Sequence, residues 1–258
     1  MSEKRELRHW PDRLEDVLRH ECMLLEDVHV LQETDSTQDA ARRFGSRPGE
    51  VVTAWRQIRG RGRSGRSWAD TGEDGIAVTI CIGSIPADHL MIVSAVATAE
   101  AIEQYLHAEV GIKWPNDIII NGRKVAGILI EQHDDVALVG IGINVSQDRW
   151  DPELENVAIS LHQLGLEVDR LSLLGSLLIS IDRNLQKEYD VLSLSYARRD
   201  ALVGQRARFR TPAGDLEGEV LEVDPRSHIR LRCDMDLHML PIATCTLLEW
   251  HPRTGTDE

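Results

Sequence analysis

The chain of 258 residues has few aromatic residues, few cysteines and many fewer basic than acidic side chains. Its 29 Lys and Arg stand against 43 Asp and Glu, and the formal charge of −14 argues against a general affinity for nucleic acid or anionic membranes, because both are negatively charged. The four cysteines form no C-x-x-C pair, which is typical of reduced thiols in a cytosolic protein. No segment has the apolar length of a secretory signal or a membrane span, so we expect a cytoplasmic protein.

Motifs for metal binding and for nucleophilic catalysis are also absent from the sequence. The ten histidines include no H-E-x-x-H motif and no His/Cys cluster at metal-ligand spacing, so no tightly bound metal is expected. No Ser-His-Asp or Cys-His signature indicates a protein nucleophile. With 42% apolar and 28% charged residues, the composition is that of an ordinary soluble globule, large enough for one large and one small domain.

The hydrophobic pattern predicts three parts: a helical extension at 1–27, a main domain at 28–198 and a small β domain at 199–258. Strands of the main domain are expected at 28–31, 51–55, 75–82, 118–120, 125–131 and 136–145, and helices at 11–25, 35–45, 90–107 and 171–196. Since the strands come in hairpins, we expect an α+β fold with a mixed sheet flanked by helices. Four short strands, at 205–210, 216–223, 229–232 and 244–250, predict a small β-barrel.

The most informative segment is the loop from Trp55 to Trp68, which contains five arginines and no acidic residue. Its glycines allow the backbone to approach a ligand, and its arginines can bind phosphate or carboxylate oxygens in a bidentate manner. The loop lacks a Walker A motif, and its G-x-G-x-x-G spacing leads to a strand at Gly75 instead of a helix. We expect an anion-binding loop; a solvated basic loop and an RNA-contacting patch remain alternatives.

A second constellation runs from Lys113-Trp-Pro-Asn-Asp117 through an Asn-Gly turn to Glu131. With Asn121 and Gly122 as the turn, Asp117 pairs with Ala126 and lies on the same face as Lys124, about 7–8 Å away. At that distance the two charges could hold a ligand between them without collapsing into one ion pair. The alternative is a charged, solvent-facing side of a hairpin.

Two shorter segments complete the set of motifs. Asp35 to Gln38 begins a helix, where Ser36 and Thr37 are ordinary N-caps, and a binding role would require their hydroxyls to face the pocket of the arginine loop. The strand residues Gly140 to Asn144 contain two glycines and an asparagine, and Gly127 also lies inside a strand. These glycines indicate a close approach to the backbone, and the asparagine indicates a buried amide.

In this order, the four segments resemble the biotin protein ligase family. Its hallmarks are a D-S-T-N-like segment, a Q-x-x-G-R-G-R-x-G-R-x-W loop, a K-W-P-N-D hairpin continuing to K-x-x-G-I-L-x-E, and a G-I-G-I-N strand. Here Gln38 replaces the usual Asn, and Ile58-Arg59 replaces Thr-Ala, which could change the affinity of a biotin pocket. The resemblance runs from about Val28 through the C-terminal β domain and implies a class II synthetase-like catalytic fold with an SH3-like domain.

The resemblance implies an enzyme that adenylates biotin with Mg²⁺ and ATP and transfers biotin to a lysine of a carboxylase's biotin carboxyl-carrier domain. Its catalytic residues would be Arg63, Lys124 and Asp117. Biotin would be bound by Ser36, Thr37, Gln57, Gly60, Arg61, Lys124 and Gly127. The nucleotide would be bound by Arg61, Arg63, Trp68, Asn116, Asp117 and Asn144, with Trp68 stacked on adenine.

Some members of this family also carry an N-terminal helix-turn-helix and repress transcription. Residues 1–30 of this chain contain five Lys and Arg against eight Asp and Glu, and about 27 residues precede the first matched segment. Because a DNA-binding arm is basic, we expect a ligase without repressor function. Whether the chain forms a homodimer is left open by the sequence.

Overall fold

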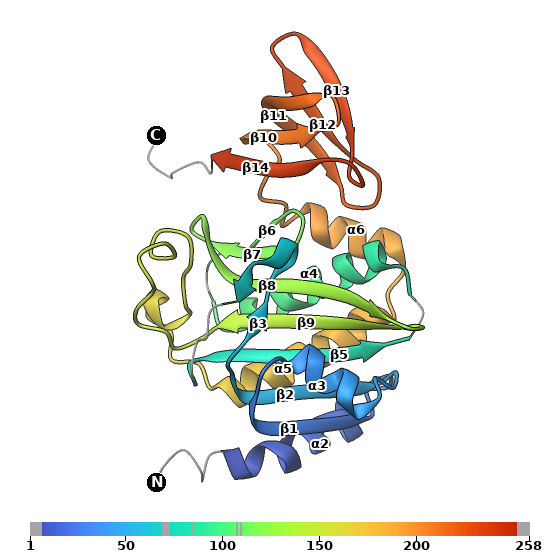
Figure 1. The fold of residues 1–258 in the computed structure, drawn as a ribbon, viewed down its shortest axis with the longest axis vertical. Coiled ribbons are helices and arrows are strands. Elements are labelled where there is room, and N and C mark those ends of the chain that lie inside the picture. The colour runs from blue at the N-terminus through green and yellow to red at the C-terminus, as the bar shows by residue number, and fades with distance from the viewer. Residues whose placement is uncertain (1–6, 69–72, 84, 107, 109, 252–258) are drawn as a thin grey trace.

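The computed structural model describes residues 7–68, 73–83, 85–106, 108 and 110–251, which form a seven-stranded sheet with helices packed on it, a five-stranded sheet and a two-stranded sheet (Figure 1). The main sheet has seven strands, in the order β1 (Asp27–Thr34), β2 (Glu50–Gln57), β5 (Gly75–Ile82), β9 (Val136–Asn144), β8 (Arg123–His133), β7 (Asp117–Ile120) and β6 (Gly111–Lys113). The β1–β2 pair is parallel and the other pairs are antiparallel. The predicted mixed sheet is therefore confirmed.

Helices cover the two faces of this sheet unequally (Figure 1). The main core packs one face against α4 (Ala87–Glu103) and α5 (Arg170–Leu185), with α2 (Trp10–Glu21) and α6 (Tyr189–Ala197) beside them. The short α3 (Thr37–Phe44) packs on the other face over Val52, Cys81 and Leu138. Much of that second face is left uncovered by the described helices, and the candidate site residues described below lie over it.

The strand register gives the second face a row of small residues. Because directly paired residues point to the same side of a sheet, the pairings align one residue from each of six adjacent strands. In sheet order these are Ala54, Ala77, Gly142, Gly127, Asp117 and Lys113. The row therefore forms a flat floor with little side-chain volume that ends in a carboxylate and an ammonium group.

The C-terminal residues form a separate five-stranded antiparallel sheet. Its strand order is β13 (Asp236–Pro241), β12 (His228–Cys233), β11 (Gly214–Asp224), β10 (Arg206–Thr211) and β14 (Thr246–His251). Among the described residues β13 and β14 are edge strands, so the expected barrel is an open sheet, which is compatible with an SH3-like domain. The edge strand β13 was not expected from the sequence, because only Leu240 of its side chains is buried.

Two further expectations need correction or restriction. The single helix expected at 171–196 is two helices, since Glu188 is extended and the chain turns between Leu185 and Tyr189. The turn allows Leu192 and Tyr196 of α6 to be buried. Residues 1–6 and 252–258 of the expected terminal parts lie outside the described residues. No helix in the described ranges has the length and apolar character needed to cross a bilayer.

Short elements complete the chain. They are the 3-10 helices η1 (Leu7–His9), η2 (Arg63–Gly65) and η3 (His162–Leu164) and the two-residue strands β3 (Gly60–Arg61) and β4 (Ser67–Trp68). The β3–β4 pair folds the arginine loop back on itself, because Gly60 pairs with Trp68 and Arg61 with Ser67. This closes the loop over the uncovered face of the main sheet.

Candidate functional site

One cavity of about 460 Å³ lies over the floor of small residues and reaches the C-terminal sheet. Eleven of the residues predicted from the sequence line it: Ser36, Thr37, Gln57, Arg61, Arg63, Trp68, Asn116, Asp117, Lys124, Gly127 and Asn144. The structure thus brings together residues from four separate segments, while their roles toward a ligand stay predictions. Gly60 is the one predicted site residue outside the lining; a Cβ there would meet the Gln57 Nε2 atom and the Trp68 Cβ atom.

At one end of the cavity a hydroxyl and amide network is assembled around Thr37. Its backbone N–H donates to Gln57 Oε1 at 2.9 Å, and its hydroxyl oxygen accepts from Thr79 Oγ1 at 2.9 Å. Ser36 is the N-cap residue of α3, but its side chain makes no capping hydrogen bond. The capping interpretation is therefore wrong for this hydroxyl, and Ser36 lines the cavity instead. Thr79 was not identified from the sequence because only strand register brings it to Thr37.

Gln38 occupies the space beside one of the strand glycines. Its Nε2 donates to the carbonyls of Leu129 and Leu138 at 3.1 and 3.2 Å, and a Cβ at Gly140 would lie 3.0 Å from its Cδ. The longer side chain, which stands where the family that this sequence resembles usually has Asn, is therefore held by hydrogen bonds to two strands. It lines the cavity next to Thr37.

The hairpin carrying Lys124 differs from the predicted register by one residue. Ile119 pairs with Lys124 as expected, but Asp117 pairs with Gly127 and not with Ala126, because Val125 is an extra residue on β8. Such a β-bulge re-aims the side chains around it. The bulge places the Lys124 side chain over Gly127, where an added Cβ would lie 2.8 Å from Lys124 Nζ.

Asp117 and Lys124 share a face as predicted, yet they are in direct contact. Lys124 Nζ lies 2.5 Å from Asp117 Oδ1, and Lys113 Nζ lies 3.1 Å from Asp117 Oδ2. The prediction that they remain apart is therefore wrong for this structure, because a lysine side chain is long enough to reach a diagonal neighbour on the adjacent strand. Burial alone would raise the pKa of Asp117, but the two lysines outweigh it and hold the pKa below its ordinary value. Asp117 is thus a carboxylate at neutral pH.

The Trp68 ring lies on the glycine floor. Added Cβ atoms at Gly127 and Gly142 would lie 2.8 and 2.6 Å from the indole ring, so these two positions must lack a side chain. Lys124 Nζ lies 5.2 Å from the ring centroid, within the range of a cation–π interaction. The close approach predicted at Gly127 is confirmed, and in this structure the approaching groups are Trp68 and Lys124.

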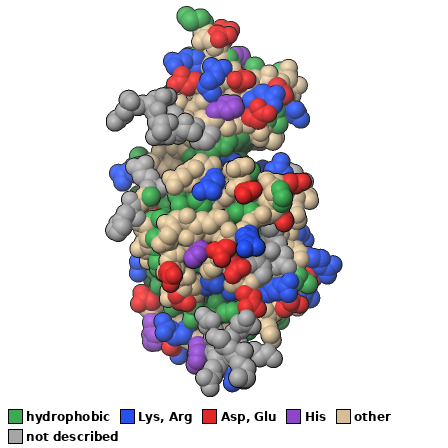
Figure 2. Space-filling view, turned by 90° about the vertical axis from the view of Figure 1, so that its left-hand side faces the viewer, with side chains coloured by type: hydrophobic (Ala, Val, Ile, Leu, Met, Phe, Trp, Pro, Cys, Tyr) green, Lys and Arg blue, Asp and Glu red, His purple; other side chains and the backbone are tan. Residues whose placement is uncertain are grey.

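The arginines of the loop have different partners. Arg61 contacts Glu131 at 2.8 Å and Asp39 at 3.0 Å, and Arg63 donates to Asn116 Oδ1 at 3.5 Å. Burial lowers the pKa of Arg63, opposed by Asp117, although a guanidinium stays charged at neutral pH. Figure 2 shows basic and acidic side chains intermixed on the face in view, and the described residues there form no broad basic patch of the kind that an RNA-contacting surface would need.

Asn144 has the buried amide that its strand position predicted. Its Nδ2 donates to the carbonyls of Lys124 and Ile159, each at 3.2 Å. The backbone N–H of Lys124 donates to the carbonyl of Val157 at 2.7 Å. Asn144 and the 157–159 segment therefore hold the bulged backbone that presents Lys124.

Sequence reasoning gave no role to several residues that the structure brings to the cavity. These are Lys113 and residues 245–250 of the C-terminal part, together with Trp150, Leu154, Val157 and Ala158 of the segment after β9. Lys113 was part of a quoted motif, and its alignment with Asp117 could be found only from the register. Within the described residues, no group of three or more His, Cys, Asp or Glu is arranged to hold a metal ion.

Comparison with known proteins agrees with this arrangement. The model of the biotin/lipoate A/B protein ligase family matches residues 30–148. The chain is 31% identical over 198 residues to the biotin–[acetyl-CoA-carboxylase] ligase of Mycobacterium tuberculosis, covering 71% of this chain and 73% of that protein. It is 32% identical over 211 residues to the bifunctional ligase/repressor BirA of Bacillus subtilis, covering 76% of this chain but 65% of the relative.

A solved structure shares the architecture. The biotin protein ligase from Aquifex aeolicus, in complex with biotin and ATP, superposes with a TM-score of 0.79 at 25% identity, over 87% of this chain and 99% of that chain. The match therefore includes both the main sheet and part of the C-terminal sheet. On the combined sequence and structural similarity, the chain belongs to the biotin protein ligase family.

Proposed function

We propose that this protein is a biotin–[biotin carboxyl-carrier protein] ligase that uses MgATP as co-substrate. One observation carries the proposal: a single cavity has hydroxyl and amide groups at one end and Lys124, Arg63 and Asp117 at the other, with a flat glycine floor between them. Biotin has the matching order of groups, namely a polar ureido ring, an apolar body and a carboxylate. Family membership and the ATP and biotin named for the Aquifex structure support the same substrates.

The first step joins two anions. The biotin carboxylate oxygen attacks the α-phosphorus of ATP, a bond forms between them, and the bond to pyrophosphate breaks. Because both reactants are negatively charged, fixed cations lower the barrier by neutralising the charge of the transition state. We assign this role to Lys124 and Arg63, with Arg61 joining once a ligand competes with Glu131 and Asp39 for it. Mg²⁺ enters with ATP as part of the substrate.

In the second step the amine of an acceptor lysine attacks the carbonyl of biotinyl-5′-AMP, and AMP leaves. The amine must lose a proton, and Asp117 would hold Lys124 against the anhydride or would assist that amine. Gln57, Thr37 and Ser36 would bind the ureido ring, and the backbone around Gly127 and Gly60 would line the apolar body. Trp68 and Asn144 would lie on the nucleotide side, with Asn116 next to Arg63.

We also propose how the chain is divided into domains and where the protein acts. We infer a catalytic domain at 28–198 and a C-terminal domain at 199–258, acting on the carrier domain of a carboxylase in the cytoplasm, where MgATP is supplied. The excess of acidic residues at 1–30 supports a ligase without repressor function. The Bacillus relative is named as both a ligase and a repressor, but the match to this chain covers only 65% of that protein.

The test is biotin-dependent release of pyrophosphate from ATP by the purified chain, with lipoate in place of biotin as the matched control. We expect release with biotin and a much lower rate with lipoate. An equal or faster rate with lipoate would contradict biotin as the substrate and would favour lipoate, which the family description also names. If neither biotin nor lipoate caused pyrophosphate release, the proposed adenylation would be contradicted.

A further inference from the structure

Lys113 and Trp250 lie at the cavity without a role in the mechanism described above. Lys113 ends β6, its Nζ lies 3.1 Å from Asp117 Oδ2, and 20% of its side chain is exposed. The same Nζ lies 5.5 Å from the ring centroid of Trp250 in β14. Lys113 therefore connects the carboxylate next to Lys124 with an aromatic side chain of the C-terminal sheet.

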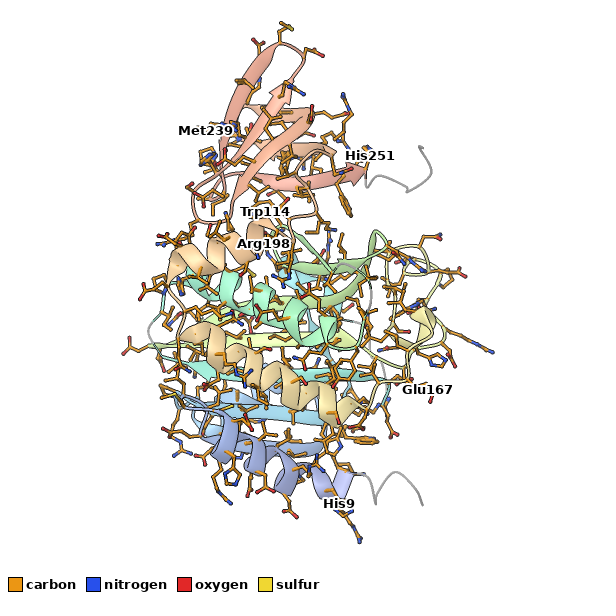
Figure 3. The ribbon with its side chains drawn as sticks, turned by 180° about the vertical axis from the view of Figure 1, so that it is seen from behind. His9, Trp114, Glu167, Arg198, Met239 and His251 are labelled. Carbon is orange, nitrogen blue, oxygen red and sulfur yellow. The ribbon has the colours of Figure 1, made fainter. Side chains whose placement is uncertain are left out.

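The residues on either side of Lys113 also contact the C-terminal part of the chain. Ile112 N–H donates to the Arg199 carbonyl at 2.6 Å, and the Ala201 N–H donates to the Ile112 carbonyl at 3.0 Å. The Trp114 ring lies 6.4 Å from that of Phe209 in β10. In Figure 3 the labelled Trp114 lies where the C-terminal sheet meets the rest of the molecule. Lys113 and Trp114 thus contact the C-terminal sheet directly beside the cavity, and Ile112 bonds to the segment that leads into it.

Two lysines share the charge of the Asp117 carboxylate. Each carboxylate oxygen is in contact with a different ammonium group, Oδ1 with Lys124 and Oδ2 with Lys113. If Lys124 were the sole partner, the partly buried carboxylate would attract it alone and would compete more strongly with a bound anion. A second ammonium group on the other oxygen draws the carboxylate's charge away from Lys124, and at this degree of burial such charge–charge interactions are only partly screened.

We propose that Lys113 is a positioning residue that shares the charge of Asp117, so that Lys124 remains available to an anionic substrate, and that Trp250 of the C-terminal sheet holds Lys113 in this place. The proposal rests on the proposed function, because the anion is the α-phosphate of ATP or the biotin carboxylate. It makes the C-terminal sheet part of the adenylation site through one aromatic ring.

The first test compares Lys113→Met in two backgrounds. Affinity for α,β-methylene ATP is measured by calorimetry with biotin present, beside kcat and KM for biotin-dependent pyrophosphate release. In the wild-type background Lys113→Met should weaken affinity and raise the KM for ATP about tenfold, a loss that corresponds to one well-placed charge. In the Asp117→Asn background the same substitution should change affinity by less than about threefold. An equal loss in both backgrounds would overturn the proposal, since Lys113 would then bind the anion itself.

The second test removes the aromatic ring. Trp250→Leu should weaken affinity for the analogue about threefold, the size of a surface cation–π contact, and should have no further effect in the Lys113→Met background. Trp250→Phe should restore most of the loss. A loss from Trp250→Leu that is the same with and without Lys113 would contradict the proposed link, because it would reflect packing alone.

A matched control is available at a second contact with the C-terminal sheet. Arg226, in the turn between β11 and β12, lies 4.5 Å from the ring centroid of Tyr189 in α6, away from the cavity. Arg226→Met should leave affinity for the analogue unchanged, and an equal loss there would overturn the assignment to Trp250. A wild-type chain that binds the analogue but releases no pyrophosphate would contradict the proposed function, while the calorimetric comparisons would still decide the role of Lys113.

Discussion

The cavity and the C-terminal sheet both carry ion pairs, and these pairs differ in how far they are exposed to water. On the C-terminal sheet the cross-strand pairs are well exposed, as for Arg230 and Glu222, whose side chains are 46% and 45% exposed. In the cavity the side chain of Asp117 is 17% exposed and contacts two lysines. Exposed pairs are screened by water and contribute little to stability, whereas shielded charges keep their attraction for a ligand. Burial therefore separates the ion pair to which we assign a function from the solvated ones.

Removing the side chain of Lys124 from the cavity should have the largest effect on the adenylation rate. Lys124→Ala should lower biotin-dependent pyrophosphate release by about 100-fold or more, the loss typical of one preorganised group at a developing charge. The variant should still fold, because Lys113 remains in contact with the Asp117 carboxylate. Arg230→Ala on the C-terminal sheet is the matched control and should leave the rate unchanged. Near wild-type turnover in Lys124→Ala would refute its assigned role.

Gly142 at the cavity and Gly218 in the C-terminal sheet allow the same substitution to be compared in the two regions. At Gly142 an added Cβ would meet the Trp68 ring, which belongs to a loop, whereas at Gly218 it would meet the Arg232 backbone in a neighbouring strand. Gly142→Ala should therefore lower the adenylation rate about tenfold with a modest loss of stability. Gly218→Ala should lower the free energy of unfolding by about 1–3 kcal/mol and spare the rate of folded protein. Rate assays and denaturant titrations would check both, and the reverse pattern would refute the difference.

Asp200, in the connection between the two regions, provides a test based on pH. Burial raises the pKa of Asp200 to about 6 from 3.8, against hydrogen bonds from the N–H groups of Val203 and Leu202. A raised pKa in the folded state means that stability is fully present below pH 3.8 and is lost as the pH rises to about 6. Asp200→Asn should remove this loss and stabilise the protein by about 1–2 kcal/mol at pH 7.5. Unfolding titrations at pH 4 and pH 7.5 would test this, and an equal change at both values would contradict it.

The smallest effect is expected from the exposed pairs. Reversing one pair with Glu222→Arg and Arg230→Glu together should change the free energy of unfolding by less than about 0.5 kcal/mol and should not alter the rate. Urea titration at low and high salt would measure it. A change of several kcal/mol would show that exposure does not separate the two kinds of ion pair.

Most strands of the main sheet could be predicted from the sequence, because a continuous apolar run such as Gly75–Ile82 is typical of a buried strand. The bulge at Val125 could not, since an extra residue leaves no mark on the apolar pattern, and it changes the partner of Asp117 by one residue. The edge strand β13 exposes Leu237 and Met239 and so lacks the buried alternation that identifies a strand. The contact between Lys113 and Trp250 depends on how two sheets pack, which motif spacing does not encode.

The most direct test of the account is the mass of a carrier domain after incubation with this protein, biotin and MgATP. The account predicts an increase by one biotinyl group on a single lysine, dependent on both small molecules, and abolished by Lys124→Ala but preserved by Arg230→Ala. An unchanged carrier mass with folded wild-type protein would contradict the claim that the cavity performs adenylation and transfer.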